Sequence, residues 1–135
     1  MGKKILLVDD DDALCDSLME QLQLHDEFEL SVSGTVKEGL DLLEKEYFDC
    51  ILLDVGLPDL NGIAACRSMR RNGIKTPIVM LTASDTDTVL VIDAGANNYI
   101  MKPFRIGVLL NAIRSELCLN EYSEDADLLI GPYTF

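Results

Sequence analysis

The strongest constraint on the fold of this 135-residue chain is a set of four short apolar segments, each followed at once by a polar residue. The polar positions are Asp9-Asp10 after residues 5–8, Asp54 after 50–53, Thr82 after 78–81 and Lys102 after 99–101. Apolar segments of this length are typical of parallel strands that are buried on both faces. The carboxyl ends of such strands lie at one edge of the sheet. The pattern therefore predicts carboxylates, a hydroxyl and an ammonium close together at that edge.

Amphipathic patterns lie between these strands and predict a doubly wound α/β fold. Apolar residues recur at helical spacing over 13–24, 36–43, 63–69, 87–94 and 105–118. Residues 28–32 alternate between apolar and polar, so we expect a more exposed strand there. Five strands alternating with five helices predict a parallel sheet with helices on both faces. Ligands bind at the carboxyl ends of the strands in such sheets, where Asp9, Asp10 and Asp54 would meet.

The composition excludes several classes of function. The chain has 11 basic and 24 acidic residues and a net charge of −13, so its surface repels the phosphates of nucleic acids and of anionic lipids. No apolar stretch approaches the roughly 20 residues of a membrane span, and the N-terminus lacks the features of a signal peptide. We therefore expect a cytoplasmic protein without membrane contact. No Cys-x-x-Cys pair is present, which favours reduced core thiols over a zinc site or a redox motif. The cysteines concerned are Cys15, Cys50, Cys66 and Cys118.

The order of these motifs resembles the receiver domain of bacterial two-component response regulators over about residues 3–118. The residues that carry the resemblance are Asp9-Asp10, the Asp-x-x-Leu-Pro-x-x-Asn-Gly pattern from Asp54 to Gly62, Thr82-Ala83, Tyr99 and Lys102-Pro103-Phe104. The resemblance implies a flavodoxin-like sheet of five strands in the order 2-1-3-4-5.

The resemblance also implies the chemistry of the site. Asp54 would accept a phosphoryl group from a sensor histidine kinase in a reaction that depends on Mg²⁺. Oxygens of Asp10 and Asp54 and the backbone carbonyl of Gly56 would bind the Mg²⁺, and Asp9 would hold a water on it. Such a chain is a phosphoacceptor switch that catalyses only its own phosphorylation and dephosphorylation.

Two further residues would bind the phosphoryl group, and a third would respond to it. The Lys102 ammonium and the Thr82 hydroxyl would each bind a phosphoryl oxygen. In the family, Thr82 moves toward that group and Tyr99 turns inward behind it. The surface formed by the fourth helix, fifth strand and fifth helix then changes, and it can form a phosphorylation-dependent homodimer.

This chain departs from the family in the region that switches. Only 12 residues separate Thr82 from Gly95, fewer than is usual, so we expect a shortened or irregular 84–94 segment. Asn97-Asn98 replaces an acidic pair, and Ala112 replaces a common arginine. We therefore expect dimerisation through this surface to be weak or to use apolar contacts, and Arg114 is one of the charges that remain.

The chain divides into three parts on sequence. Residues 1–118 form the receiver domain, and residues 119–127 read as an acidic linker. Residues 128–135 resemble the first strands of the winged-helix DNA-binding domain in OmpR-type regulators, cut off by truncation. The full protein would then be a transcription factor that contacts DNA only through the missing domain.

Other interpretations remain open for the same residues. Asp9 to Asp12 could be a solvated acidic run at a helix start, and Asp54, Thr82 and Lys102 could be ordinary strand-end residues. Phosphatases of the haloacid-dehalogenase type also use an aspartate nucleophile with Mg²⁺, but they carry an Asp-x-Asp motif. Gly56 lies two residues after Asp54, and a motif formed by Asp9 and Asp11 would leave Asp54 and Thr82 without their fitting roles. No Gly-x-Gly-x-x-Gly follows the first strand, which disfavours a nucleotide-binding module. A receiver that works without phosphate is a further alternative.

Overall fold

The computed structural model describes residues 2–24, 27–57, 59–83 and 88–129 of the chain. The strands are β1 (Lys3–Val8), β2 (Phe28–Ser33), β3 (Cys50–Asp54), β4 (Ile78–Thr82) and β5 (Asn98–Met101). The helices between and after them are α1 (Asp12–Gln23), α2 (Val36–Lys45), α3 (Gly62–Arg71), α4 (Thr88–Asp93) and α5 (Ile106–Leu129). All strands pair in parallel in the order β2-β1-β3-β4-β5, which confirms the predicted topology.

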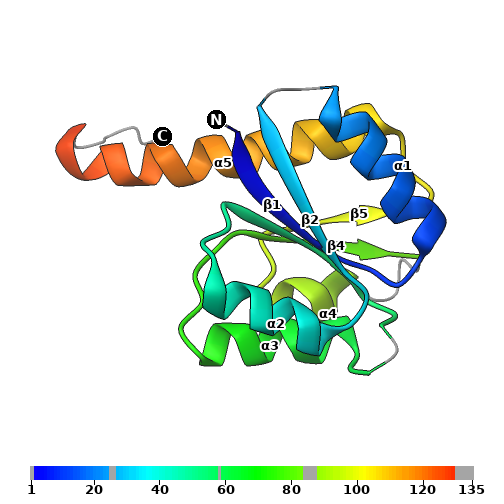
Figure 1. Cartoon of the computed structure of the whole chain (residues 1–135). Coiled ribbons are helices and arrows are strands. Elements are labelled where there is room, and N and C mark those ends of the chain that lie inside the picture. The colour runs from blue at the N-terminus through cyan, green and yellow to red at the C-terminus, as the bar shows by residue number, and fades with distance from the viewer. Residues whose placement is uncertain (1, 25–26, 58, 84–87, 130–135) are drawn as a thin grey trace.

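The sheet separates two layers of helices (Figure 1). α2, α3 and α4 cover one face and pack on alternate strand residues such as Leu6, Leu53 and Met80. α1 and α5 cover the other face and pack on the residues between them, such as Leu7 and Leu52. The central strands β3 and β4 are buried along their whole length, whereas β2 lies at the edge and is partly exposed, as its alternating pattern predicted.

Short polar side chains cap the N-termini of α1, α2 and α3. Asp11 accepts a hydrogen bond from Leu14 N–H, Thr35 accepts one from Glu38 N–H, and Asn61 accepts one from Ile63 N–H. Each cap satisfies a backbone donor that the first turn of a helix leaves without a partner. Gly73 and Gly95, which follow α3 and α4, have φ angles of +86° and +108°, a conformation that glycine adopts at little cost.

Two features of the C-terminal helix differ from expectation. α5 does not end near residue 118 but continues to Leu129 and projects beyond the sheet (Figure 1), so the segment 119–127 that we expected as a linker is helical. The physical reason is that the first helix-breaking pair after the start of α5 is Gly131-Pro132. Residues 128 and 129 are therefore helical rather than the start of a strand, and 130–135 lie outside the described residues.

The thiols follow the core prediction in three of four cases. Cys15, Cys50 and Cys66 are buried, and burial raises the pKa of Cys15 to about 11 and that of Cys50 to about 12. Cys118 was predicted to lie in the core and is exposed, because it falls on the outer side of α5. None of the helices in the described ranges has the length and apolar character needed to span a membrane.

Arg70, at the end of α3, holds the loops at the amino edge of β4. Its guanidinium donates to the carbonyls of Gly95 (2.9 Å), Ile74 (2.9 Å) and Thr76 (2.8 Å). It also donates to Asn97 Oδ1 (2.7 Å), which in turn accepts from Ile78 N–H (2.9 Å). One side chain thus joins the loop after α3 to the loop between α4 and β5.

We expect Arg70→Met to lower the free energy of unfolding by about 2 kcal/mol, because the variant keeps the apolar stem and loses charged hydrogen bonds to several carbonyls. Chemical denaturation measures the change. Arg71→Met is the matched control, since it removes the same charge from the exposed neighbouring residue. Equal unfolding free energies for the two variants would contradict the role assigned to Arg70.

Candidate functional site

The register of the sheet brings the predicted site residues to one edge. The last paired positions are Val8 with Leu53, Asp54 with Leu81, and Thr82 with Met101. Backbone hydrogen bonds extend the ladder beyond these pairs, from Val55 N–H to the Leu81 carbonyl (3.0 Å) and from Lys102 N–H to the Thr82 carbonyl (2.7 Å). Asp9, Asp54, Thr82 and Lys102 therefore lie at the carboxyl ends of four adjacent strands, as the sequence predicted.

The Lys102 ammonium lies between two carboxylates of this edge. Its Nζ donates to Asp9 Oδ2 at 2.9 Å and to Asp54 Oδ1 at 3.1 Å. Asp9 is 1% exposed, and its other oxygen accepts a hydrogen bond from Asp11 N–H at 2.9 Å. Burial alone would lower the pKa of Lys102, but the hydrogen bonds to Asp9 and Asp54 outweigh it and raise that pKa. The lysine is therefore charged and oriented by both carboxylates.

Asp54 is the carboxylate whose charge is least well compensated. Its pKa is raised above the ordinary 3.8, first because the side chain is desolvated and second because Asp9 repels it. The ion pair with Lys102 and a hydrogen bond from the Gly56 backbone act in the opposite direction and only partly offset the shift. The Asp54 side chain is thus mostly buried and is held by its ion pair with Lys102.

A third carboxylate completes an acidic cluster that fits a hard divalent cation. Asp9, Asp10 and Asp54 each offer an oxygen, and these oxygens lie within 4.8 Å of one another. Asp10 is exposed while the other two are buried, so the cluster opens to solvent on one side. The Lys102 ammonium pairs with Asp9 and Asp54, and Mg²⁺ prefers oxygen ligands such as these carboxylates. The residues present therefore fit the expected Mg²⁺, and the exposed backbone of Gly56 lies in the loop that follows Asp54, the last residue of β3.

Asp11 has a structural role that bears on the phosphatase alternative. In an Asp-x-Asp arrangement built on Asp9, Asp11 would be the acid or base. Its side chain instead caps α1 by accepting from Leu14 N–H at 3.1 Å. The second residue after Asp54 is Gly56, which carries no acid or base. Asp11 thus has a helix-capping role, and no acid or base lies two residues after Asp54.

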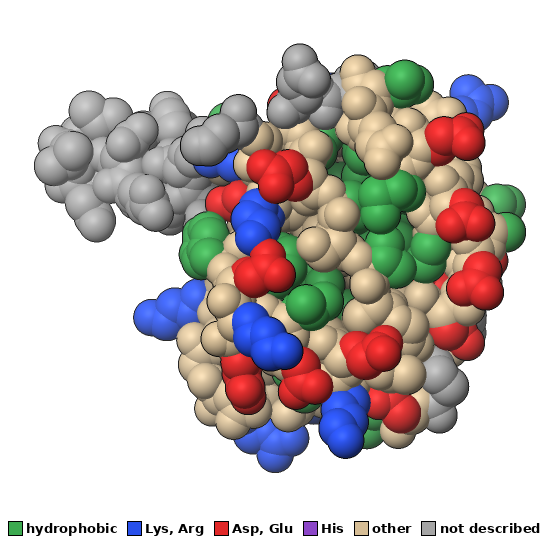
Figure 2. All heavy atoms as spheres, viewed as in Figure 1, with side chains coloured by type: hydrophobic (Ala, Val, Ile, Leu, Met, Phe, Trp, Pro, Cys, Tyr) green, Lys and Arg blue, Asp and Glu red, His purple; other side chains and the backbone are tan. Residues whose placement is uncertain are grey.

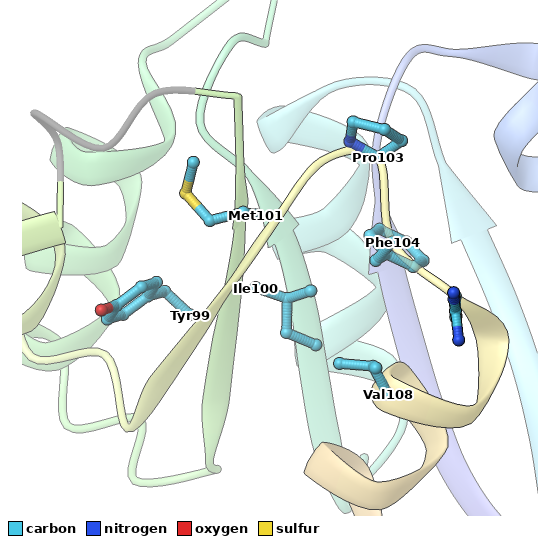
Figure 3. Close-up of a pocket in the computed structure, with 7 residues that line it drawn as sticks. Tyr99, Ile100, Met101, Pro103, Phe104 and Val108 are labelled. Atoms are coloured by element: carbon cyan, nitrogen blue, oxygen red, sulfur yellow. The ribbon is translucent and has the colours of Figure 1, made fainter.

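The two proposed switch residues differ in exposure. Thr82 is buried at the end of β4, whereas Tyr99 on β5 is 38% exposed. The Tyr99 ring extends from β5 in the direction opposite to the Ile100 side chain (Figure 3), and Tyr99 and Val108 line the same hollow. Tyr99 lines two adjacent surface hollows of about 410 and 300 Å³, one toward α5 and one toward α4.

Exposed apolar side chains lie on the elements around Tyr99. They come from α4 and α5, namely Val89, Ile92 and Val108. An exposed group of this kind is typical of an interaction surface. On the face that Figure 2 views, apolar side chains lie among Asp, Glu, Lys and Arg side chains. Within the described residues α4 spans Thr88–Asp93, and because residues 84–87 lie outside the described ranges, the expected shortening of the 84–94 segment stays a prediction.

Arg114 does not contribute to this surface. Its guanidinium forms an ion pair with Glu27, next to the start of β2, and lies over the ring of Phe28. The helix α5 therefore turns this charge toward the edge of the sheet where β2 lies. Arg114 is thus occupied within the chain, rather than being available for the dimer contacts that we considered for it.

Sequence reasoning missed two contacts of the site. It assigned Lys102 to the phosphoryl group but not to Asp9, which is 93 residues away. It also gave no role to Asp59, whose carboxylate binds the first turn of α2. Neither contact leaves a local signal, because both partners meet only after the strands have paired.

Comparison with known proteins places these observations in a family. Residues 5–114 match the family described as "Response regulator receiver domain". The DNA-binding response regulator MtrA of Mycolicibacterium smegmatis is 40% identical over 131 residues, which cover 96% of this chain and 56% of that protein. The chain thus spans little more than half the length of this relative.

Solved structures agree with the fold. The CheY-like receiver domain protein from Methanospirillum hungatei has a TM-score of 0.84 and 34% identity, covering 91% of this chain and 99% of that one. The receiver domain of sensor histidine kinase PA1611 from Pseudomonas aeruginosa, solved with a magnesium ion coordinated in its active site cleft, has a TM-score of 0.74 and 28% identity, covering 87% and 98%. Together with the acidic edge described above, these matches show that the chain belongs to the receiver domain family of two-component response regulators.

Proposed function

We propose that this receiver accepts a phosphoryl group on Asp54 from a histidine kinase in a Mg²⁺-dependent reaction. The observation that carries the proposal is the position of the Lys102 ammonium, which bonds to both Asp9 and Asp54 beside the exposed carboxylate of Asp10. This arrangement combines a nucleophile, a fixed cation and a cluster of oxygen ligands in one place.

The residues of the chain supply positioning and charge for the transfer. An Asp54 carboxylate oxygen forms a bond to phosphorus while the bond from phosphorus to the donor nitrogen or oxygen breaks, which gives an acyl phosphate. Mg²⁺, held by Asp9, Asp10, Asp54 and the Gly56 carbonyl, would offset the repulsion among the carboxylates and the charge of the incoming group. Lys102, already directed at Asp54, would exchange part of that contact for a phosphoryl oxygen. Thr82, at the end of the adjacent strand, would bind another.

The output of the reaction is a change of surface rather than a product. Phosphorylation adds nearly two negative charges and three acceptor oxygens at the end of β3. We propose that Thr82 and Tyr99 carry this change to the surface of α4, β5 and α5. The relative MtrA is named as DNA-binding, and it extends well beyond the region matched here. A winged-helix domain after the receiver, outside this chain, would bind DNA in the same way.

Incubation with a small phosphodonor tests this function. We expect the intact mass of the protein to rise by one phosphoryl group when Mg²⁺ is present and to stay unchanged with a chelator. Continuous release of phosphate from the donor, with no lasting adduct, would favour the phosphatase alternative instead. Absence of any adduct in folded protein that binds Mg²⁺ would indicate a receiver that accepts the phosphoryl group only from its kinase or one that works without phosphate.

We propose that self-association of the phosphorylated form uses the apolar surface around Tyr99. The variant Val108→Lys should weaken a dimer of the beryllofluoride-treated protein at least about tenfold, or about 1.4 kcal/mol, because it places a charge among contacts that become buried. Sedimentation velocity measures the dissociation constant. The control is Leu24→Lys, which changes an exposed leucine at the end of α1. A tight dimer that Val108→Lys leaves intact and Arg114→Ala abolishes would contradict the proposal.

A further inference from the structure

Asp59 connects the loop after β3 to a different helix. The described residues between β3 and α3 are 55–57 and 59–61. Asp59 Oδ1 accepts a hydrogen bond from Val36 N–H at 3.0 Å, and Oδ2 accepts one from Lys37 N–H at 3.1 Å. Val36 and Lys37 are the first two residues of α2, so one carboxylate binds two backbone donors of the helix start.

The start of α2 therefore has two separate caps. Thr35, its own N-cap residue, accepts from Glu38 N–H at 3.1 Å, and Asp59 takes the two donors before it. The negative charge of Asp59 also suits the positive end of the helix dipole. The hydrogen bond from Val36, followed by others from the backbone, lowers the pKa of Asp59, so the carboxylate is charged at neutral pH.

The loop that Asp59 holds carries Gly56, whose backbone carbonyl is a proposed Mg²⁺ ligand. At its ends the loop is fixed by Gly62 N–H, which donates to the Val55 carbonyl at 2.8 Å, and by the Asn61 cap of α3 at 2.7 Å. Leu57 is buried against the core shared by α2 and α3. Asp59 adds a connection from the middle of the loop to α2, which lies beside α3 in the same layer (Figure 1).

We infer that Asp59 is a positioning residue for the acidic site, an inference that rests on the proposed function. By holding the loop on α2, its carboxylate fixes the backbone of Gly56 relative to Asp54. Gly56 is an exposed residue with no side chain, and its backbone N–H donates to the Asp54 carboxylate. The connection from Asp59 to α2 adds a second restraint on the segment that carries the Gly56 carbonyl. A cation bound by Asp9, Asp10 and Asp54 would then find the loop carbonyl already in place. The cost of ordering the loop is met when the protein folds.

Isothermal titration of Mg²⁺ into the phosphate-free protein tests the inference without any reaction. We expect Asp59→Ala to raise the dissociation constant about tenfold, as loss of outer contacts does at other metal sites. Thr35→Ala is the matched control, because it removes the other cap of α2 and leaves the loop untouched. We expect it to change the dissociation constant less than about twofold, although both variants lower the denaturation midpoint by loss of a cap.

Two further variants test whether an effect of Asp59→Ala comes from lost positioning of the loop, from the lost negative charge or from failure to fold. Asp59→Asn keeps one acceptor oxygen, so we expect its Mg²⁺ dissociation constant to lie between those of the wild type and Asp59→Ala. If Asp59→Ala does not fold, Asp59→Asn replaces it in the test. Asp41→Asn removes a carboxylate from the exposed side of α2 and should have little effect in about 0.15 M salt, where distant charges are screened.

The possible results separate the positioning role of Asp59 from the proposed phosphoacceptor function. Weaker Mg²⁺ binding in Asp59→Ala than in Thr35→Ala supports the positioning role. Equal binding in the two variants, with normal binding by the wild type, overturns that role and leaves the proposed function intact. A wild-type protein that does not bind Mg²⁺ overturns both.

Discussion

The variant Asp54→Asn will carry no phosphoryl group after incubation with donor and Mg²⁺, whereas the wild type will carry one. The reason is that the amide of asparagine is a very poor nucleophile, while the rest of the site keeps its geometry. Lys102 retains its partner Asp9 at 2.9 Å and is still held at the edge of the sheet. Intact mass measured on both proteins in parallel gives the result.

The same variant should be more stable than the wild type in the presence of a chelator. The raised pKa of Asp54 means that the folded protein binds its proton more tightly than the unfolded chain does. The wild type therefore loses stability as the pH rises from the ordinary 3.8 through the raised value, and it stays less stable above that value. Asp54→Asn lacks this loss, so the difference between the two unfolding free energies should grow over that interval and then level off.

Asp41→Asn is the control for both measurements, since this exposed residue lies in the middle of α2. It should accept a phosphoryl group as the wild type does and show no added stability in chelator. A full adduct on Asp54→Asn would show that another residue is the acceptor. Lower stability of Asp54→Asn at neutral pH would contradict the account of charge repulsion in the site.

Gly62→Ala should destabilise the protein by about 3 kcal/mol, at the upper end of the cost of inserting a methyl group into a packed region. A Cβ at position 62 would lie 2.1 Å from the Asp54 carbonyl oxygen and 2.8 Å from Val55 Cα. Both are backbone atoms of the segment that carries the phosphoacceptor, so neither can move aside as a flexible side chain does. Relief of the clash requires either α3 or the end of β3 to shift.

This loss runs against the usual effect of the same substitution in a helix. Alanine favours helix over glycine by up to about 1 kcal/mol, and Gly62 is the first residue of α3. Gly107, in the first turn of α5, has open space where a Cβ would lie, so Gly107→Ala is the matched control and should be neutral or stabilising. Thermal and chemical denaturation of both variants give the comparison. Equal stability of Gly62→Ala and the wild type would contradict the close approach of α3 to β3.

The sequence predicted the strands and the edge residues because their signals are local. Each buried strand is a continuous apolar run, and its end is marked by the polar residue that emerges there, as at Asp54 and Thr82. Parallel pairing then places these residues together. The caps Asp11 and Thr35 were predictable for the same reason, since a cap lies next to the helix that it begins.

The features that escaped prediction depend on contacts between distant parts of the chain or on the extent of a helix. Asp59 binds α2 across 22 residues, and Arg70 reaches loops at the far end of β4. The Arg114 side chain extends toward Glu27 because of the way α5 packs on the sheet. The sequence pattern of α5 alone does not specify this packing. α5 extends past residue 118 because none of the acidic residues in 119–127 breaks a helix. Acidic residues are compatible with a linker and with a helix, so composition alone does not place the end of α5.

Mapping the phosphoryl group to a residue tests the central claim most directly. The wild-type protein would be reacted with a small phosphodonor in Mg²⁺ and, separately, in chelator, then digested and analysed by tandem mass spectrometry. We predict one modified residue, Asp54, in the Mg²⁺ sample and none in the chelator sample. A phosphoryl group on any other residue, or on Asp54 to the same extent in chelator, would contradict the site described here.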